Sequence, residues 1–130
     1  MRTMMKSKIH RARVTAVNVD YEGSIAIDQE LMRQADILPY EQVHILNVNN
    51  GARFHTYAIE GPENGGDICL NGAAARLVAK GDIVIILTYH ELEEEQCRDY
   101  HPRLVYVDEK NRITRTKGAM DEVLDILRSN

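Results

Sequence analysis

The sequence predicts a mainly β protein, built as one small closed barrel with a few short helices. Most apolar residues lie in short runs that alternate with polar residues or are rich in β-branched side chains, and turn-forming residues separate these runs. Helical spacing is confined to three places. Because closure removes exposed strand edges, many short strands with few helices favour a barrel.

The strand predictions follow from local patterns of apolar and turn residues. Two period-two segments flank Asn49-Asn50-Gly51, whose residues tolerate positive φ, and this arrangement predicts a hairpin. A second hairpin is expected around residues 108–111. The β-branched run 82–89 is typical of a strand buried on both faces. We expect strands over residues 14–19, 43–48, 53–59, 82–89, 104–107 and 112–116.

A first helix is predicted to start at Asp28, whose carboxylate can cap it. It would place Leu31, Ala35 and Leu38 on one face, and Pro39 would stop it.

Two further helices are expected. One runs from Ala73 to Lys80, with Gly81 supplying the left-handed residue past its end. The other is a C-terminal helix over residues 119–127, which serves either as a docking face for the rest of the subunit or as a partner-binding helix. Its apolar stripe consists of Met120, Val123, Leu124 and Leu127.

Length and charge limit the classes of function. A chain of 130 residues suits a single domain over residues 1–130. The net charge of −4 argues against binding to a phosphate backbone, so we expect no nucleic-acid partner. The longest apolar run, residues 83–87, is too short to cross a membrane. Residues 1–8 lack a signal-peptide pattern, and we expect a cytoplasmic protein.

The cysteines and acidic residues indicate neither a disulfide framework nor a metal centre. Cys69 and Cys97 are far apart in the chain, which fits a reducing compartment. The region after residue 89 contains possible metal ligands without the spacing of a zinc site, so no metal is expected and the glutamate run is interpreted as a solvated surface. These possible ligands are His90, Glu91, Glu93, Glu94, Glu95, Cys97 and His101.

The dipeptide Gly23-Ser24 has an ordinary interpretation and a chemical one. Taken alone, it is a turn. Alternatively, the serine hydroxyl can attack the glycyl carbonyl, with the missing glycine side chain allowing close approach and unusual backbone angles. The resulting ester can eliminate and hydrolyse to a pyruvoyl group, a ketone that forms a Schiff base with an amine and accepts electrons.

The surrounding motifs carry a resemblance. Their order and spacing resemble those of bacterial aspartate 1-decarboxylase, the pyruvoyl-dependent enzyme family of pantothenate synthesis, over roughly residues 1–88. The segment from His90 onward is much less similar. The motifs are Lys8-Ile9-His10-Arg11, Tyr21-Glu22-Gly23-Ser24 with Ala26-Ile27-Asp28, Asn49-Asn50-Gly51 with Arg53, Thr56-Tyr57-Ala58-Ile59, Asn71-Gly72-Ala73-Ala74-Ala75, and residues 81–86.

The resemblance implies a double-psi β-barrel and a homotetramer with active sites between subunits. It implies self-cleavage at Gly23-Ser24 into a β chain of residues 1–23 and an α chain of residues 24–130. The cofactor would be a pyruvoyl group made from Ser24, without pyridoxal phosphate or metal. The substrate would be L-aspartate and the products β-alanine and carbon dioxide. Whether cleavage needs a helper protein stays open.

The resemblance also implies roles for individual residues. Ser24 would become the pyruvoyl group, Thr56 would assist cleavage and Tyr57 would donate a proton. Substrate-binding positions match Lys8, Arg53, Asn71, Gly72, Ala73 and Ala74, and His10 and Tyr21 are secondary positions near the cleavage site.

Each role has a plainer alternative. Arg53 can offer a planar fork and Lys8 a point charge to the two carboxylates of aspartate, yet without the resemblance both are better interpreted as solvated surface charges. Tyr57 could be an ordinary amphipathic tyrosine, and Asn71 simply a helix start.

In an ideal strand Arg53, His55 and Tyr57 share one face while Thr56 points away. Either a bulge re-aims Thr56 or cleavage uses the other face. Two readings of the whole chain also stay open, a non-enzymatic barrel and an unprocessed precursor.

Overall fold

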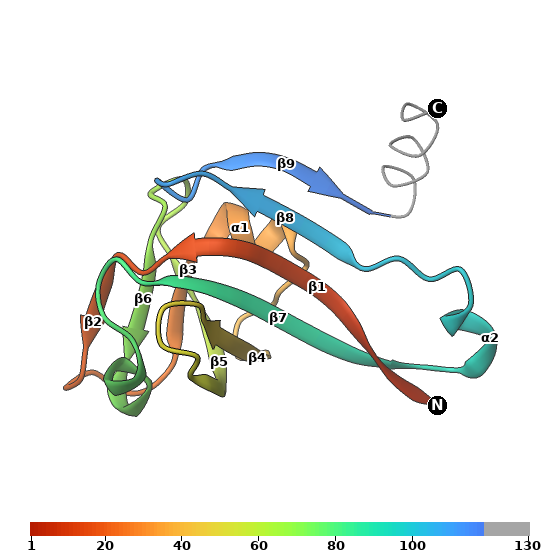
Figure 1. The fold of residues 1–130 in the computed structure, drawn as a ribbon, viewed down its shortest axis with the longest axis horizontal. Helices are drawn as coiled ribbons and strands as arrows, with labels where there is room; N and C mark the ends of the chain where they lie inside the picture. Colours follow the sequence, from red (N-terminus) through yellow and green to blue (C-terminus); the bar gives the residue numbers. More distant parts are fainter. Residues whose placement is uncertain (119–130) are drawn as a thin grey trace.

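The computed structural model describes residues 1–118 and confirms the mainly β class (Figure 1). Nine strands form the bulk of this region, with two short α-helices and one 3₁₀ helix. The strands are β1 (Arg2–Arg13), β2 (Ala16–Asn18), β3 (Ile25–Asp28), β4 (Gln42–Asn47), β5 (Arg53–Gly61), β6 (Ile68–Asn71), β7 (Ile83–Leu92), β8 (Arg103–Val107) and β9 (Ile113–Lys117). The helices are α1 (Gln29–Gln34), the 3₁₀ helix η1 (Gly72–Leu77) and α2 (Glu94–Cys97).

The sheet closes because the chain continues from β1 into β2. The strand order is β2-β6-β3-β5-β4-β7-β1-β8-β9. At the junction, Val14 N–H donates to Asp82 O at 2.9 Å beside β7, and Thr15 N–H donates to Ile68 O at 2.8 Å on β6. The β1–β2 segment therefore links the two sides of the sheet, and the expected small barrel is confirmed.

The barrel interior is almost entirely aliphatic. Alternate residues of the neighbouring strands point inward, as the period of a strand requires. Fully buried examples are Ile9, Ile25, Ile27, Val43, Ile45, Ile68, Leu70, Val84, Ile86 and Val105. This core holds the short β3 and β6 in place, and these two strands carry the site described below.

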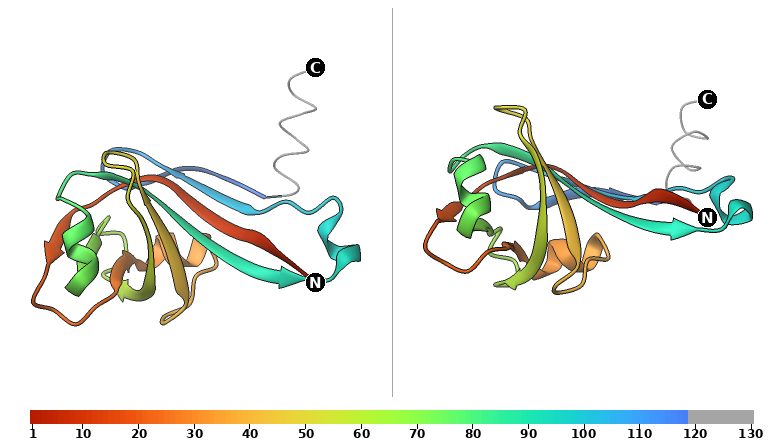
Figure 2. Two further views of the ribbon diagram at one scale, coloured as in Figure 1. Left: turned by 60° about the horizontal axis from the view of Figure 1, so that its bottom comes forward. Right: turned by 90° about the horizontal axis from the view of Figure 1, so that it is seen from below.

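An arm extends from the barrel. The first half of β1 pairs with the second half of β7, from Arg2 opposite Leu92 to Met5 opposite Tyr89. Figures 1 and 2 show these two strands running together beyond the barrel, with α2 at their far end. The Tyr100 hydroxyl donates to Met5 O at 2.9 Å and so ties the segment after α2 to β1.

The first helix begins as expected and ends early. Asp28 Oδ1 accepts from Glu30 N–H at 2.7 Å, which confirms the predicted cap. The helix stops at Gln34, and Asp36 adopts a left-handed φ of 54°. This turn brings Ile37 into the core and leaves Leu38 67% exposed, so the predicted place of Leu38 on the helix face is wrong.

The second helical prediction, residues 73–80, is also wrong in extent and type. The segment is the 3₁₀ helix Gly72–Leu77, and Val78 is already extended. Gly81 does have a positive φ of 92°, but it belongs to a separate turn in which its N–H donates to Val14 O. The predicted helix over residues 119–127 lies outside the described residues.

Both predicted hairpins are confirmed, as β4–β5 and β8–β9. The strand predicted over residues 14–19 is only Ala16–Asn18, and it is exposed. β1, the longest strand, was not predicted because its pattern is polar. Its inward Ser7 is buried and its hydroxyl shares a hydrogen bond of 2.5 Å with Thr88 Oγ1, so a polar residue occupies a core position.

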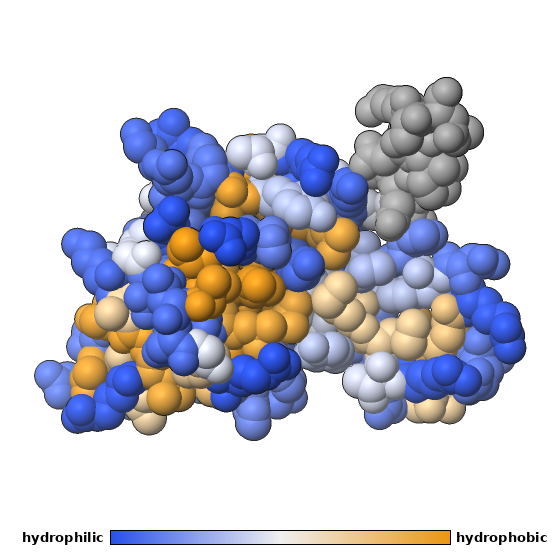
Figure 3. All heavy atoms as spheres, viewed as in Figure 1, coloured by the Kyte–Doolittle hydropathy of each residue, from blue (hydrophilic) through white to orange (hydrophobic). Residues whose placement is uncertain are grey.

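The prediction that residues 82–89 are buried on both faces is wrong for most of the outer face, where Leu87 is buried but Ile83, Ile85 and Tyr89 are not. Val84, Ile86 and Thr88 are buried, whereas Ile85 is half-buried and Tyr89 is 40% exposed. Figure 3 shows apolar side chains gathered on the surface over this part of the barrel. The outer face of β7 is therefore an apolar surface of the single chain.

Candidate active site

Ser24 lies in the loop that joins β2 to β3 and is held in an unfavourable backbone conformation. Its φ is 104°, and its side chain is 1% exposed. A residue other than glycine at positive φ costs about 1–3 kcal/mol and persists only where its surroundings enforce it. Ser24 is thus a buried, strained hydroxyl residue directly after Gly23.

Asn71 is the neighbour that holds Ser24. β3 and β6 are antiparallel, with Ile25 opposite Leu70, so the next pair along the ladder is Ser24 and Asn71. Asn71 N–H donates to Ser24 O at 2.9 Å, and Asn71 Nδ2 donates to Ser24 Oγ at 3.3 Å. Asn71 is itself 4% exposed, which places an amide donor beside the hydroxyl and away from bulk water.

The glycine that the surroundings of Ser24 require is Gly72. Its φ is 62°, and a Cβ atom there would lie 2.8 Å from Gly23 Cα and 3.1 Å from Tyr21 O. Gly23 is not among the positive-φ residues, so the expectation of unusual angles at Gly23 is corrected: the unusual angle belongs to Ser24. The Tyr21 side chain is 53% exposed, and its backbone is the part that meets Gly72.

The register of β5 answers the question about Thr56. β4 and β5 pair without a register shift from Gln42 opposite Tyr57 to Leu46 opposite Arg53, so no bulge re-aims Thr56. β3 pairs with β5 only from Ile25 opposite Ala58 onward. The preceding part of β5 therefore presents an edge level with Ser24, where side chains from both of its faces can reach the loop.

Tyr57 and Thr56 both reach the site from this edge. The Tyr57 hydroxyl donates to Gly23 O over 3.5 Å, and the ring stacks on Tyr40 with centroids 6.3 Å apart. Tyr57 is 38% exposed and Thr56 is half-buried. A phenol therefore lies over the carbonyl that precedes Ser24.

A cavity of about 260 Å³ joins these groups. It brings together most of the residues expected from the sequence, and it adds three that were not expected: Phe54, His55 and Leu77. The period of two places Phe54 with Thr56 and His55 with Tyr57, so the strand pattern could have found them. The residues that line the cavity are Gly23, Ser24, Phe54, His55, Thr56, Tyr57, Asn71, Ala73, Ala74 and Leu77.

The single chain does not bring Lys8 to this cavity. A row of outward residues crosses the sheet from His55 to His44, Leu87 and Lys8, on β5, β4, β7 and β1. Neighbouring strands are about 4.8 Å apart, so Lys8 lies roughly 14 Å along the sheet from His55. Lys8 is thus separated from Ser24 within one chain.

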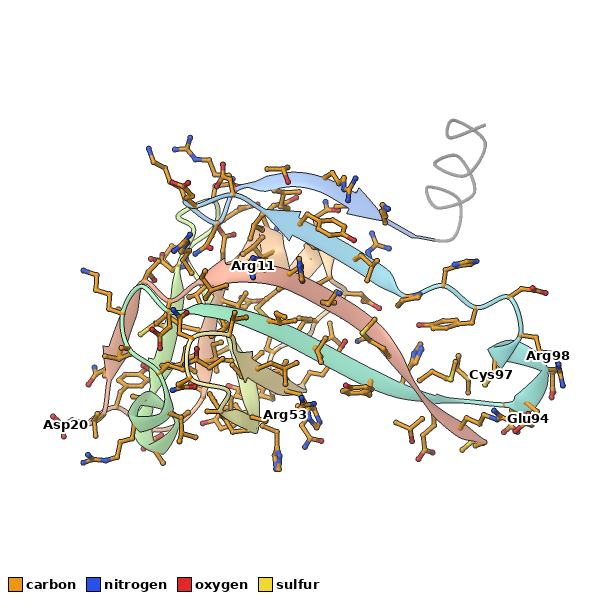
Figure 4. The ribbon with its side chains drawn as sticks, viewed as in Figure 1. Arg11, Asp20, Arg53, Glu94, Cys97 and Arg98 are labelled. Carbon is orange, nitrogen blue, oxygen red and sulfur yellow. The ribbon has the colours of Figure 1, made fainter. Side chains whose placement is uncertain are left out.

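Arg53 is exposed at the start of β5, next to the cavity-lining Phe54. Figure 4 shows Arg53 on β5 and Arg11 on β1, with β4 and β7 between these strands in the sheet. Lys8 lies on β1 as Arg11 does, so within one chain the two expected cationic positions, Arg53 and Lys8, lie on strands that β4 and β7 separate.

His10 lies on β1 beside a second cavity of about 200 Å³. Its ring meets Tyr106 edge-on, and burial, followed by the charges of Lys8 and Arg11, lowers the pKa of His10 below its ordinary value. Among the described residues, its buried Nδ1 has no hydrogen-bond partner. His10 is likewise remote from Ser24 in the single chain.

The described residues contain a larger cavity away from Ser24, and they show neither a cluster of metal ligands nor a helix that could span a membrane. A larger cavity of about 490 Å³ lies between α1 and β9 and is lined by residues such as Glu30, Arg112 and Arg115. Within residues 1–118, no three histidine, cysteine or acidic side chains gather as metal ligands would. The same region contains no helix long and apolar enough to cross a membrane. Cys69 and Cys97 are both free thiols.

Known proteins place this chain in one family. A sequence profile of the aspartate decarboxylase family matches residues 1–114, beyond the region to about residue 88 where the sequence resemblance was expected. The aspartate 1-decarboxylase of Dehalococcoides mccartyi is 60% identical over 117 residues, covering 90% of this chain and 94% of the relative.

Two other relatives give the same picture. The aspartate 1-decarboxylase of Thermoanaerobacter pseudethanolicus is 59% identical over 111 residues, covering 85% of this chain and 95% of the relative. That of Syntrophomonas wolfei is 60% identical over 113 residues, covering 87% and 96%. With a family match over most of its length and relatives of this similarity, the chain belongs to the aspartate decarboxylase family.

Proposed function

We propose that this chain cleaves itself between Gly23 and Ser24, converts Ser24 into a pyruvoyl group and decarboxylates L-aspartate to β-alanine for pantothenate synthesis. One observation carries the proposal: Ser24 is a buried serine at a φ of 104°, with an amide donor on its hydroxyl and a phenol on the carbonyl before it. Family membership supplies the reaction class.

The surroundings of Ser24 fit the cleavage step. Ser24 Oγ would form a bond to the Gly23 carbonyl carbon, the Gly23–Ser24 C–N bond would break, and the hydroxyl proton would end on the released nitrogen. Asn71 Nδ2 can stabilise charge on the attacking oxygen, and the Tyr57 hydroxyl can stabilise charge on Gly23 O. Breaking the peptide bond also releases the strain stored at Ser24.

The second stage makes the cofactor. The ester oxygen leaves as the carboxylate of Gly23 when Ser24 loses its α-hydrogen, and water then replaces the nitrogen, which departs as ammonia. The site has room for the resulting planar ketone because Ala73 and Ala74 line it with little side-chain bulk. The pyruvoyl ketone supplies an electron sink for loss of a carboxylate from a bound amino acid.

The chain's own residues would bind and protonate the substrate. Arg53 lies beside the cavity and suits a bidentate contact with one carboxylate of aspartate. Tyr57 lines the cavity and suits proton donation to the carbon that loses carbon dioxide. His10 and Tyr21 remain secondary positions: the Tyr21 backbone meets Gly72 at the cleavage loop, whereas His10 would have to act from a neighbouring subunit.

Lys8 would act from a neighbouring subunit. It lies across three strand spacings from His55, so a homotetramer with shared sites explains how it could reach a carboxylate. The apolar outer face of β7 suits contact with another subunit. The proposal further includes one domain over residues 1–130 and a cytoplasmic location. It covers both cleavage by the chain alone and cleavage assisted by a maturation helper protein.

Denaturing mass spectrometry tests the proposal. Active protein is expected to contain two pieces, residues 1–23 and residues 24–130, with the larger piece carrying a carbonyl that reacts with a hydrazide. Ser24→Ala should remain whole, unlabelled and unable to produce β-alanine. Decarboxylation by the alanine variant, or by wholly uncleaved protein, would refute the assignment of Ser24.

A further inference from the structure

Cys69 contacts the residue that holds Ser24. It lies two positions before Asn71 on β6, so the two side chains share one face of the strand. Cys69 Sγ lies 3.3 Å from Asn71 Oδ1, within hydrogen-bond range for sulfur. A continuous path therefore runs from the Cys69 thiol through the Asn71 amide to Ser24 Oγ.

The thiol distinguishes the two ends of the Asn71 amide. A thiol is a weak donor, and an amide oxygen is an acceptor only. With the S–H donating to Oδ1, the NH₂ end of Asn71 faces Ser24 Oγ at 3.3 Å. The reversed amide would aim NH₂ at sulfur, a weak acceptor, and would aim its oxygen at the Ser24 hydroxyl.

This orientation matters for self-cleavage. As Ser24 Oγ attacks the Gly23 carbonyl it loses its proton and gains negative charge, which an N–H donor stabilises. An amide oxygen in the same place would instead hold the hydroxyl proton and then repel the charged oxygen. Burial raises the pKa of Cys69, and the charge of Asp67 acts in the same direction, so the thiol keeps its proton at neutral pH.

We propose that Cys69 is a positioning residue for self-cleavage: its thiol holds the Asn71 amide so that Nδ2 donates to Ser24 Oγ. This inference rests on the proposed function, and it concerns the rate of chain cleavage rather than the decarboxylation that follows.

The test compares three cysteine variants as freshly purified precursors, with the cleaved fraction followed over time by denaturing mass spectrometry. Cys69→Ala removes the donor and is expected to slow cleavage about tenfold, the equivalent of about 1.4 kcal/mol in the transition state. Cys69→Ser retains a donor and should stay within about threefold of the unchanged chain, a margin of under 1 kcal/mol. Cys97→Ala is the matched control, because that thiol contacts backbone carbonyls of the arm and should leave the rate unchanged.

A double-mutant cycle separates positioning from packing. In an Asn71→Ala background, adding Cys69→Ala should cause no further loss of rate, because the amide that the thiol orients is gone. Thermal unfolding of every variant establishes that each is folded at the assay temperature.

The possible failures are distinct. An unchanged chain that stays whole even after incubation with a cell lysate, which would supply any maturation helper, overturns both the proposed function and this inference. Cleavage of the unchanged chain together with an unaltered rate in Cys69→Ala, or with additive losses in the cycle, overturns the inference alone.

Discussion

Gly72 lies directly against Gly23: a Cβ atom on Gly72 would sit 2.8 Å from Gly23 Cα and 2.9 Å from Gly23 N. These atoms belong to backbone and cannot rotate away, so the contact fixes the loop before Ser24 against the start of η1. The strained geometry at Ser24 is consequently enforced from two sides, by Asn71 through hydrogen bonds and by Gly72 through close packing.

The first prediction concerns this contact. Gly72→Ala should lower the free energy of unfolding by about 2–4 kcal/mol, combining about 1–2 kcal/mol for a left-handed alanine with the cost of overpacking. Gly51→Ala is the matched control, because Gly51 has a φ of 77° with nothing within 4 Å of an added Cβ. Urea unfolding of both variants measures the difference, and equal losses would contradict the role of the contact.

The second prediction concerns proton donation. Tyr57→Phe should reduce the rate of β-alanine formation, measured per cleaved chain, by about 10²–10⁴, the usual contribution of a positioned general acid. The free energy of unfolding should change little, because Tyr57 is 38% exposed and removing its hydroxyl leaves no buried group without a partner. Tyr40→Phe controls for the ring stack, since Tyr40 is 78% exposed and touches Tyr57 through its ring. Comparable activity losses in the two variants would argue against Tyr57 as the donor.

The third prediction concerns Thr56 and cleavage. Thr56→Val keeps the shape of the side chain and removes the hydroxyl that lines the cavity, so chain cleavage should slow by tenfold or more, or about 1.4 kcal/mol. Thr56→Ser keeps the hydroxyl and should cleave at close to the normal rate. Gel separation of the two pieces at timed intervals gives the rates. Normal cleavage in Thr56→Val would remove Thr56 from the mechanism.

The fourth prediction concerns the cap of α1. The Asp28 carboxylate is 3% exposed and accepts from three backbone N–H groups, those of Glu30, Asn64 and Gly66. Asp28→Ala should destabilise the fold by about 1–3 kcal/mol, because these donors lose a charged acceptor. Asp20→Ala, at an exposed position, should change stability by less than about 0.5 kcal/mol. Chemical unfolding measured on both variants gives the comparison.

The fifth prediction concerns pH. The pKa of His10 is lowered in the folded chain from its ordinary value of 6.5. At a pH below 6.5 the unfolded chain therefore binds a proton at His10 more readily than the folded chain does. The contribution of His10 to stability is therefore present above about pH 6.5 and is lost as the pH falls through the folded pKa. Urea unfolding at pH 7.5 and at pH 5 should show a smaller drop for His10→Gln than for the unchanged chain. An identical drop would exclude His10 as a source of the pH dependence.

Local signals in the sequence were sufficient for several parts of the fold. The hairpin around Asn49-Asn50-Gly51 follows from turn residues between two alternating segments, and its pairing is β4 with β5. The helix-capping bond from Glu30 N–H to Asp28 is likewise local, because the two residues are two positions apart in the chain. Such features were predictable because the groups that form them are neighbours in sequence. The family resemblance, in contrast, came from the order and spacing of several motifs over roughly residues 1–88, because Gly23-Ser24 taken alone predicts only a turn.

Tertiary structure decided what no local pattern contains. Ser7 occupies a core position because Thr88, 81 residues away, satisfies its hydroxyl, and this hid β1 from a hydrophobic pattern. The strain at Ser24 exists because Asn71 and Gly72, from a distant strand end, press on the loop. The sequence by itself determined which residues could do the chemistry; long-range packing decided which of them meet within one chain, and it left Lys8 on a separate part of the surface.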